Sequence, residues 1–135
     1  MNYLSKYCVI KILRLDIADY ICSHKVAVER KAYNDFISSI IDGRVFEQAK
    51  LLKESFEKPI MIIEGYSNRK INENALKGAI ASLLVDFGIS LIHTKNPLDT
   101  AKTIYWIAKK EQSEKKHTLS FRIRKKKDVK EAQEM

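Results

Sequence analysis

The 135-residue chain carries 25 Lys and Arg against 17 Asp and Glu, a net charge of +8. Its 45% apolar content, with only four Gly and two Pro, is that of one ordinary globular domain. No apolar run approaches the roughly 20 residues of a membrane span, and no signal-peptide core is visible, so we expect an intracellular protein without a membrane partner. The two Cys and three His lack metal-type spacing, which argues against a disulfide framework and a histidine metal site.

The excess positive charge suits a polyanionic partner, and most of it lies near the C-terminus. Residues 109–135 hold ten Lys or Arg and five Asp or Glu, a net of +5, which leaves +3 for residues 1–108. Apolar periodicity also fades after Glu111. We therefore divide the chain into a folded domain, residues 1–112, and a basic linker or tail, residues 113–135.

Two apolar stretches near the N-terminus predict a β-hairpin. Residues 8–15 are rich in β-branched side chains and form the first expected strand, and residues 16–19 form the turn. Residues 20–31 form the second expected strand, which is broken around residues 23–25. This hairpin would bring Asp19 towards Glu29.

The rest of the folded domain alternates between helical and extended patterns. Apolar residues recur at helical spacing after Tyr33, and the run Ile60–Ile63 is unbroken, as in a strand covered on both faces. The expected order is helix, helix, strand, helix, strand, helix, over residues 33–42, 45–56, 60–63, 74–87, 89–92 and 97–108. Such an alternation predicts a layered α/β domain.

The stretch from Val26 to Asp35 contains most of the candidate catalytic residues. Side chains alternate faces along a strand, so Glu29 and Lys31 point to one face and Arg30 to the other. Hydrolysis of a phosphodiester needs a divalent cation held by carboxylates and a lysine that stabilises the charge developing on the phosphate. Asp19 is the best second carboxylate, since Mg²⁺ usually takes one or two from a protein. Spacing alone is a weak signal, and a solvated strand end is the alternative interpretation.

A longer string of residues resembles the XPF family of structure-specific DNA endonucleases, and within it the archaeal XPF and Hef nuclease domains. The family motif reads Gly-Asp, a variable gap, then Glu-Arg-Lys-x-x-x-Asp. Glu29, Arg30, Lys31 and Asp35 match its second part fully, and Ala18-Asp19 stands where the family has Gly-Asp. The strings 39–50 and 58–65 extend the resemblance, which runs from about residue 15 to about residue 112.

The resemblance implies a restriction-endonuclease-like α/β fold, with a central mixed β-sheet flanked by helices. Family members begin with a strand that supplies a further metal ligand, and we expect this sequence to enter after that strand. The implied function is a metal-dependent endonuclease domain that works as a homodimer. Its expected substrate is branched double-stranded DNA, such as 3′ flaps and forks, in DNA repair or replication-fork processing.

The resemblance also assigns roles to the catalytic candidates. Asp19 and Glu29 would hold Mg²⁺ or Mn²⁺, and Lys31 would orient the attacking water or stabilise the phosphate charge. Arg30 and Asp35 would support the site. For Asp35, which lies in the first turn of a helix, stabilisation of the helix dipole is an equally good interpretation.

Three basic residues are predicted to bind DNA. Arg44 would contact a phosphate or support the site, and the alternative is an ordinary surface arginine at a helix start. Arg69 and Lys70 lie in a polar loop and could touch phosphates. Glu64, at the end of a strand, is either a further acid near the cleft or a solvated carboxylate.

A second function class is open: a non-catalytic relative that binds DNA and dimerises without cutting. The intact Glu29-Arg30-Lys31 favours the nuclease, whereas the absence of the family's first strand favours the non-catalytic relative. The sequence leaves open whether a helicase or a sliding clamp is a further partner.

Overall fold

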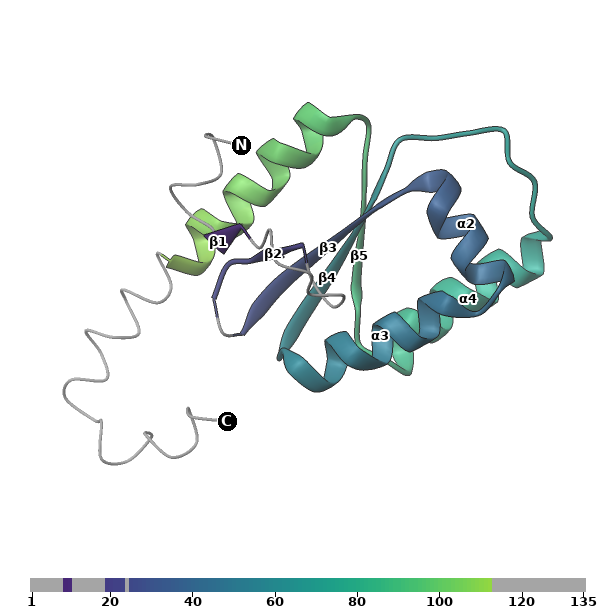
Figure 1. Cartoon of the computed structure of the whole chain (residues 1–135), viewed down its shortest axis with the longest axis horizontal. Coiled ribbons are helices and arrows are strands. Elements are labelled where there is room, and N and C mark those ends of the chain that lie inside the picture. Colours follow the sequence, from purple (N-terminus) through teal and green to yellow (C-terminus); the bar gives the residue numbers. More distant parts are fainter. Residues whose placement is uncertain (1–8, 11–18, 24, 113–135) are drawn as a thin grey trace.

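The computed structural model describes residues 9–10, 19–23 and 25–112, and shows a mixed β-sheet between two helical layers (Figure 1). Most of the expected strand 8–15, residues 16–18 of the expected turn 16–19 and the basic tail 113–135 lie outside the described residues. In chain order the elements are β1 (Val9–Ile10), β2 (Tyr20–Ile21), β3 (Val26–Ala32), α2 (Tyr33–Ile41), α3 (Arg44–Ser55), β4 (Lys58–Glu64), α4 (Glu73–Val85), β5 (Ser90–Thr94) and a helix over residues 97–112.

The sheet has the strand order β1-β2-β3-β4-β5. β1, β2 and β3 are antiparallel neighbours, whereas β3, β4 and β5 run parallel to one another. The parallel pairs need crossover connections, which α2 with α3 and then α4 provide. As a result, the carboxyl ends of β3, β4 and β5 lie along one edge of the sheet, where the loops and helix starts of such folds gather functional groups.

Each face of the sheet is covered by its own core cluster. On one face α2, α3 and α4 pack against β3 and β4, through buried residues that include Ile37, Leu52 and Leu83. On the other face the helix over residues 97–112 packs through Ala101, Ile104 and Ala108. Figure 1 shows these layers, with the three labelled helices on one side and the light green helix on the other.

The central strand β4 explains why the run 60–63 is apolar without interruption. Met61 and Ile63 belong to the cluster beneath α2, α3 and α4, whereas Ile60 and Ile62 belong to the cluster beneath the helix over residues 97–112. Successive side chains of a strand point to opposite faces, so a strand covered on both faces must be apolar at every position. The predicted doubly covered strand is confirmed.

A glycine, Gly43, forms the turn between α2 and α3. Gly43 has a φ of +85°, in the left-handed region that glycine adopts without steric cost. It follows the last turn of α2 and directly precedes Arg44, the first residue of α3. The predicted end of the first helix at Gly43 is confirmed, and the two helices pack side by side against the same sheet face.

The sequence-based fold class is confirmed, with modest shifts of the element boundaries. The strand predicted over residues 20–31 is broken as expected, into β2 and β3. α4 begins at Glu73 because the Asn72 side chain caps it, accepting hydrogen bonds from the backbone of Asn74 at 2.8 Å and Ala75 at 3.1 Å. Within the described part of the chain, no helix has the length and apolarity needed to cross a membrane.

Candidate active site

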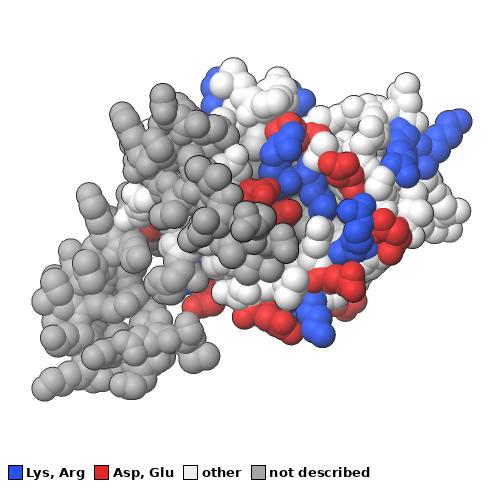
Figure 2. Space-filling model, in the orientation of Figure 1, with Lys and Arg blue, Asp and Glu red and all other residues white. Residues whose placement is uncertain are grey.

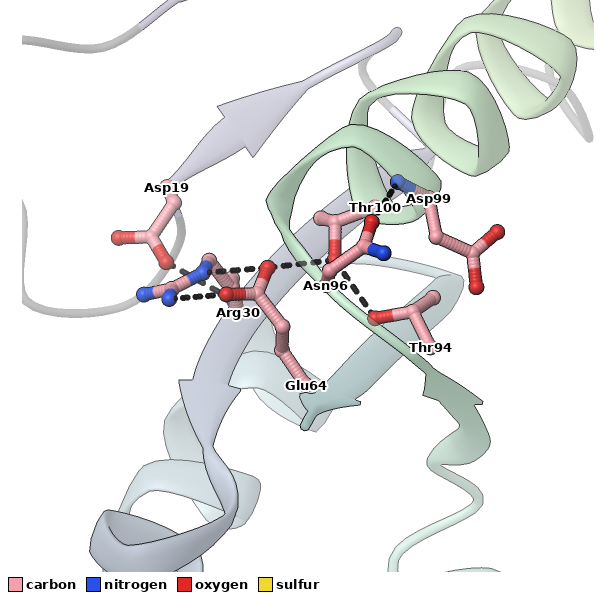
Figure 3. Close-up of polar contacts among 7 residues, drawn as sticks. All are labelled: Asp19, Arg30, Glu64, Thr94, Asn96, Asp99 and Thr100. Carbon is pink, nitrogen blue, oxygen red and sulfur yellow. Dashed lines mark hydrogen bonds and ion pairs between the residues drawn. The ribbon is translucent and has the colours of Figure 1, made fainter. Parts of the chain in front are cut away.

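The β2–β3 hairpin places Asp19 against the backbone of β3. Tyr20 pairs with Val28 in this antiparallel ladder, and the backbone N–H of Asp19 donates to the Val28 carbonyl at 3.0 Å. The paired register of the two strands ends at Tyr20, and Asp19 is the residue directly before it. Asp19 Oδ2 accepts a hydrogen bond from the Arg30 backbone N–H at 2.8 Å (Figure 3). The predicted β-hairpin is confirmed, and the approach of the two carboxylates stays a prediction.

The alternation predicted for β3 is also observed. Glu29 and Lys31 stand beside Met61 and Ile63 of β4, which face the layer of α2, α3 and α4. Arg30 extends to the other face, where its guanidinium meets Glu64. The Lys31 side chain is only 8% exposed, so its ammonium group acts in surroundings where water screens it weakly.

On the sheet face covered by the helix over residues 97–112, a chain of hydrogen bonds links Arg30 to β4, β5 and that helix. Arg30 Nε donates to Glu64 Oε1 at 3.0 Å, and Nη2 donates to Oε2 at 2.5 Å. Thr100 Oγ1 donates to Glu64 Oε1 at 2.6 Å and lies 2.6 Å from Thr94 Oγ1. Figure 3 shows the network running from β3 through the end of β4 to the first turn of the helix over residues 97–112.

Hydrogen bonding dominates the electrostatics of this network. The bond from Arg30 lowers the pKa of Glu64, with a further contribution from the Thr100 hydroxyl, and together they outweigh the opposing effect of burial. The same bond raises the pKa of Arg30. The lowered pKa of Glu64 and the raised pKa of Arg30 both mean that the ion pair is more stable with its two groups charged.

We expect the ion pair to make stability depend on pH. Folding lowers the pKa of Glu64 from its ordinary value of 4.5, so the pair contributes stability above that pH and loses it as pH falls towards the folded pKa. Hydrogen bonds to charged groups contribute about 1.5–3 kcal/mol, and we expect the lower end because Arg30 remains partly exposed to water. In urea titrations from about pH 7 to about pH 3, the stability of the wild type should converge on that of Glu64→Gln. The exposed Glu54→Gln should run parallel to the wild type; a constant gap between Glu64→Gln and the wild type would contradict the expectation.

A second cluster of charge forms where α2 turns into α3. Asp42 accepts hydrogen bonds from the backbone N–H of Arg44 at 3.0 Å and from Arg44 Nε at 2.8 Å. The Arg44 backbone bond, its side-chain bond and the nearby charges of Arg44 and Lys31 lower the pKa of Asp42. Arg44 begins α3, which covers the same face of the sheet as Lys31. Asp42 was not among the predicted site residues, although an Asp two residues before a helix start is a known capping pattern.

The loop between β4 and α4 is fastened to α2. Ser67 Oγ donates to Asn34 Oδ1 at 2.7 Å, and Arg69 Nη1 donates to Ser38 Oγ. Arg69 and Lys70 are both exposed. In Figure 2 acidic and basic side chains alternate over much of the visible face, while Lys and Arg project at the right margin over this loop. The loop thus offers positive charge on the helical layer that also covers Lys31.

Asp35 lies in the first turn of α2, directly after β3, as expected. Its side chain is exposed, and no hydrogen bond or ion pair joins it to Arg30 or Lys31 among the described residues. α2 has no side-chain cap, so a carboxylate near its N-terminus stabilises the helix dipole. The support of Arg30 comes instead from Glu64.

Comparison with known proteins adds an independent line of evidence. The profile of the ERCC4 domain matches residues 2–107 of the chain. The chain belongs to the ERCC4 domain family. The XPF-family nuclease-domain prediction is thereby confirmed, together with the relatives described next.

Three proteins similar to this ERCC4 domain show the range of the resemblance. The 3′-flap repair endonuclease Xpf of Saccharolobus solfataricus is 38% identical over 103 residues, which cover 73% of this chain and 44% of that protein. A Methanocaldococcus jannaschii protein, provisionally named an ATP-dependent RNA helicase, is 48% identical over 119 residues, covering 88% of this chain and 15% of that protein. The structure of XPF from Aeropyrum pernix in complex with DNA matches with a TM-score of 0.69 and 39% identity, covering 76% of this chain and 52% of that one.

The carboxylates of this ERCC4 domain limit where a metal ion could bind. Within the described ranges no group of three or more His, Cys, Asp and Glu side chains could hold one. Of the two predicted ligands, Asp19 directly precedes β2 and Glu29 lies in the adjoining β3. Mg²⁺ commonly binds through one or two carboxylates and keeps several waters. Glu64 is on the other face and is occupied by Arg30 and Thr100.

Proposed function

We propose that the chain is the nuclease domain of a metal-dependent, structure-specific DNA endonuclease that cleaves branched DNA such as 3′ flaps and forks in repair. The observation that carries the proposal is the hairpin geometry: Asp19 is anchored on the backbone of Arg30, next to Glu29, while Lys31 follows on the face of Glu29. Membership of the ERCC4 domain family, the similarity to a 3′-flap repair endonuclease and the similarity to an XPF structure in complex with DNA support it.

The residues present fit a hard divalent cation. Asp19 uses Oδ2 for the Arg30 N–H, and its Oδ1 accepts no hydrogen bond from the described residues. That oxygen and the Glu29 carboxylate are the donors that Mg²⁺ or Mn²⁺ prefers. When bound, the ion supplies Lewis-acid polarisation of the phosphate and a more acidic water.

Lys31 supplies the fixed positive charge of the proposed site. Its side chain is buried near the carboxyl end of β3. A preorganised charge in a poorly hydrated site stabilises negative charge that develops on a phosphate oxygen. Arg44, kept in place by Asp42, is suited to bind an adjacent phosphate in a bidentate manner, and Arg69 and Lys70 extend the same positive surface.

Assembly and partners are further parts of the proposal. The chain spans 15%, 44% and 52% of the three relatives described above, so the activity and partners of a longer protein are proposals for this chain. We propose a homodimer, as the resemblance implies. Large apolar side chains such as Trp106 and Leu98 are exposed on the helix over residues 97–112 and are available for contacts. A helicase or sliding-clamp partner remains an expectation.

The deciding experiment is cleavage of an end-labelled 3′-flap duplex by the full chain in Mn²⁺, beside EDTA and Glu29→Ala. We expect cutting that EDTA abolishes and that Glu29→Ala lowers by more than about 100-fold, since even outer partners of metal ligands account for 10–100-fold. Cutting by Glu29→Ala at the wild-type rate would refute the proposed ligand set. DNA binding without any cutting would favour the non-catalytic relative; binding alone does not discriminate, because basic residues confer it without a nuclease site.

A further inference from the structure

Arg30 is held from two sides by two carboxylates on neighbouring strands. Its backbone N–H donates to Asp19 Oδ2 at 2.8 Å, and its guanidinium donates twice to Glu64 (Figure 3). The first bond lies towards β2 and the second towards β4, so Arg30 joins the hairpin to the centre of the sheet. A contact that positions the Arg30 side chain therefore also helps to position the Arg30 backbone N–H, which binds Asp19.

The Glu64 side chain is buried and hydrogen-bonded through both of its oxygens. It is 7% exposed, and both of its oxygens are engaged: Oε1 by Arg30 Nε and by the Thr100 hydroxyl, Oε2 by Arg30 Nη2. Bidentate arginine–carboxylate pairs fix geometry as well as charge. Thr100 is itself buried and contacts Thr94 at the end of β5. A carboxylate so fully engaged by its own chain is suited to orient a neighbour, and it has little capacity left to bind a ligand.

We infer that Glu64, braced by Thr100, is a positioning residue of the active site. Acting through Arg30, it sets the placement of the Asp19 carboxylate beside Glu29, and it couples the helix over residues 97–112 to the metal-binding edge. The inference rests on the proposed function for its catalytic meaning. The part of the inference that concerns geometry, namely that Glu64 positions the Arg30 backbone, does not depend on nuclease activity.

The first test is Mn²⁺ affinity, measured by calorimetry on the full chain. Glu64→Gln leaves Arg30 facing an amide donor, and we expect binding about 10–100-fold weaker, the usual effect of outer-shell partners. Thr100→Val removes the hydroxyl that donates to Glu64, and we expect it to weaken Mn²⁺ binding less than Glu64→Gln does. Thr103→Val is the matched control, since Thr103 lies on the same helix and, among the described residues, its hydroxyl bonds only the Asp99 carbonyl, at 2.8 Å. Wild-type affinity in Glu64→Gln would overturn the inference.

A second variant separates positioning from stability. Replacing both partners, Arg30→Met with Glu64→Met, removes the ion pair without leaving a buried charge, and such replacements are often neutral for folding. We expect this double variant to unfold near the wild-type temperature and still bind Mn²⁺ weakly. A purely structural pair would instead give wild-type affinity once stability is restored, and that result would refute the inference.

Amide hydrogen exchange in EDTA provides a readout that needs neither metal nor DNA. We expect the Arg30 N–H to exchange at least about 10-fold faster in Glu64→Gln than in the wild type, at matched global stability. Unchanged exchange would overturn the inference. If the wild type binds no Mn²⁺, the proposed function fails, and the exchange experiment still decides whether Glu64 controls the Arg30 backbone.

Discussion

Lys31→Ala is expected to lose cleavage while the domain stays folded. The lysine stands on the face of Glu29, two residues further along β3, and is 8% exposed. Removal of a single preorganised charge-stabilising group commonly lowers turnover by about 10²–10³-fold. Single-turnover cleavage of a 3′-flap duplex at saturating protein measures this loss without interference from changes in binding.

Two companion variants make the Lys31 result specific. Lys31→Met keeps the apolar stem and removes only the charge, so it should show the same loss with an unchanged unfolding temperature. Lys58→Ala, at the far end of β4 and exposed, should cleave like the wild type. Retained cleavage by Lys31→Met, in a folded protein that binds DNA normally, would remove Lys31 from the mechanism.

The fold was predictable where local periodicity carries the information. The alternation of β3, the uninterrupted apolar run of β4 and the helical spacing after Tyr33 each depend on neighbours within a few residues. The break between β2 and β3 was equally visible, because the polar stretch around Ser23 interrupts the apolar pattern. Boundaries were less predictable: β5 reaches Thr94 because its register with β4 continues to Glu64, which no local signal reveals.

The candidate site was predictable in part, for a related reason. Asp19, Glu29 and Lys31 belong to one hairpin, so strand alternation and a short connection sufficed to predict that hairpin. The partner of Arg30 could not be found in this way. Glu64 lies 34 residues further along the chain and Thr100 another 36 beyond it, and their contact depends on two parallel crossovers. A strand-end carboxylate has no sequence signature that distinguishes a buried ion pair from a solvated acid.

Ile62→Ala is expected to cause the largest loss of stability. Ile62 is fully buried in β4, pairs with Arg30 in β3 and with Ile92 in β5, and packs into the cluster beneath the helix over residues 97–112. Truncating a core isoleucine to alanine typically costs about 2–5 kcal/mol. We expect about 3–4 kcal/mol, because three parallel strands in register leave little room for the cavity to collapse.

Ile41→Ala is the matched control, with the same substitution at the end of α2, where the side chain is 60% exposed. It should change stability by less than about 0.5 kcal/mol, and alanine favours the helix slightly. Thermal unfolding should separate the two variants by more than about 10 °C, given roughly 4 °C per kcal/mol for a domain of this size. A loss below about 1 kcal/mol for Ile62→Ala would mean that β4 is not the buried centre of the sheet. The same strand carries Glu64, so that result would also remove the rigid base on which the Arg30 contact depends.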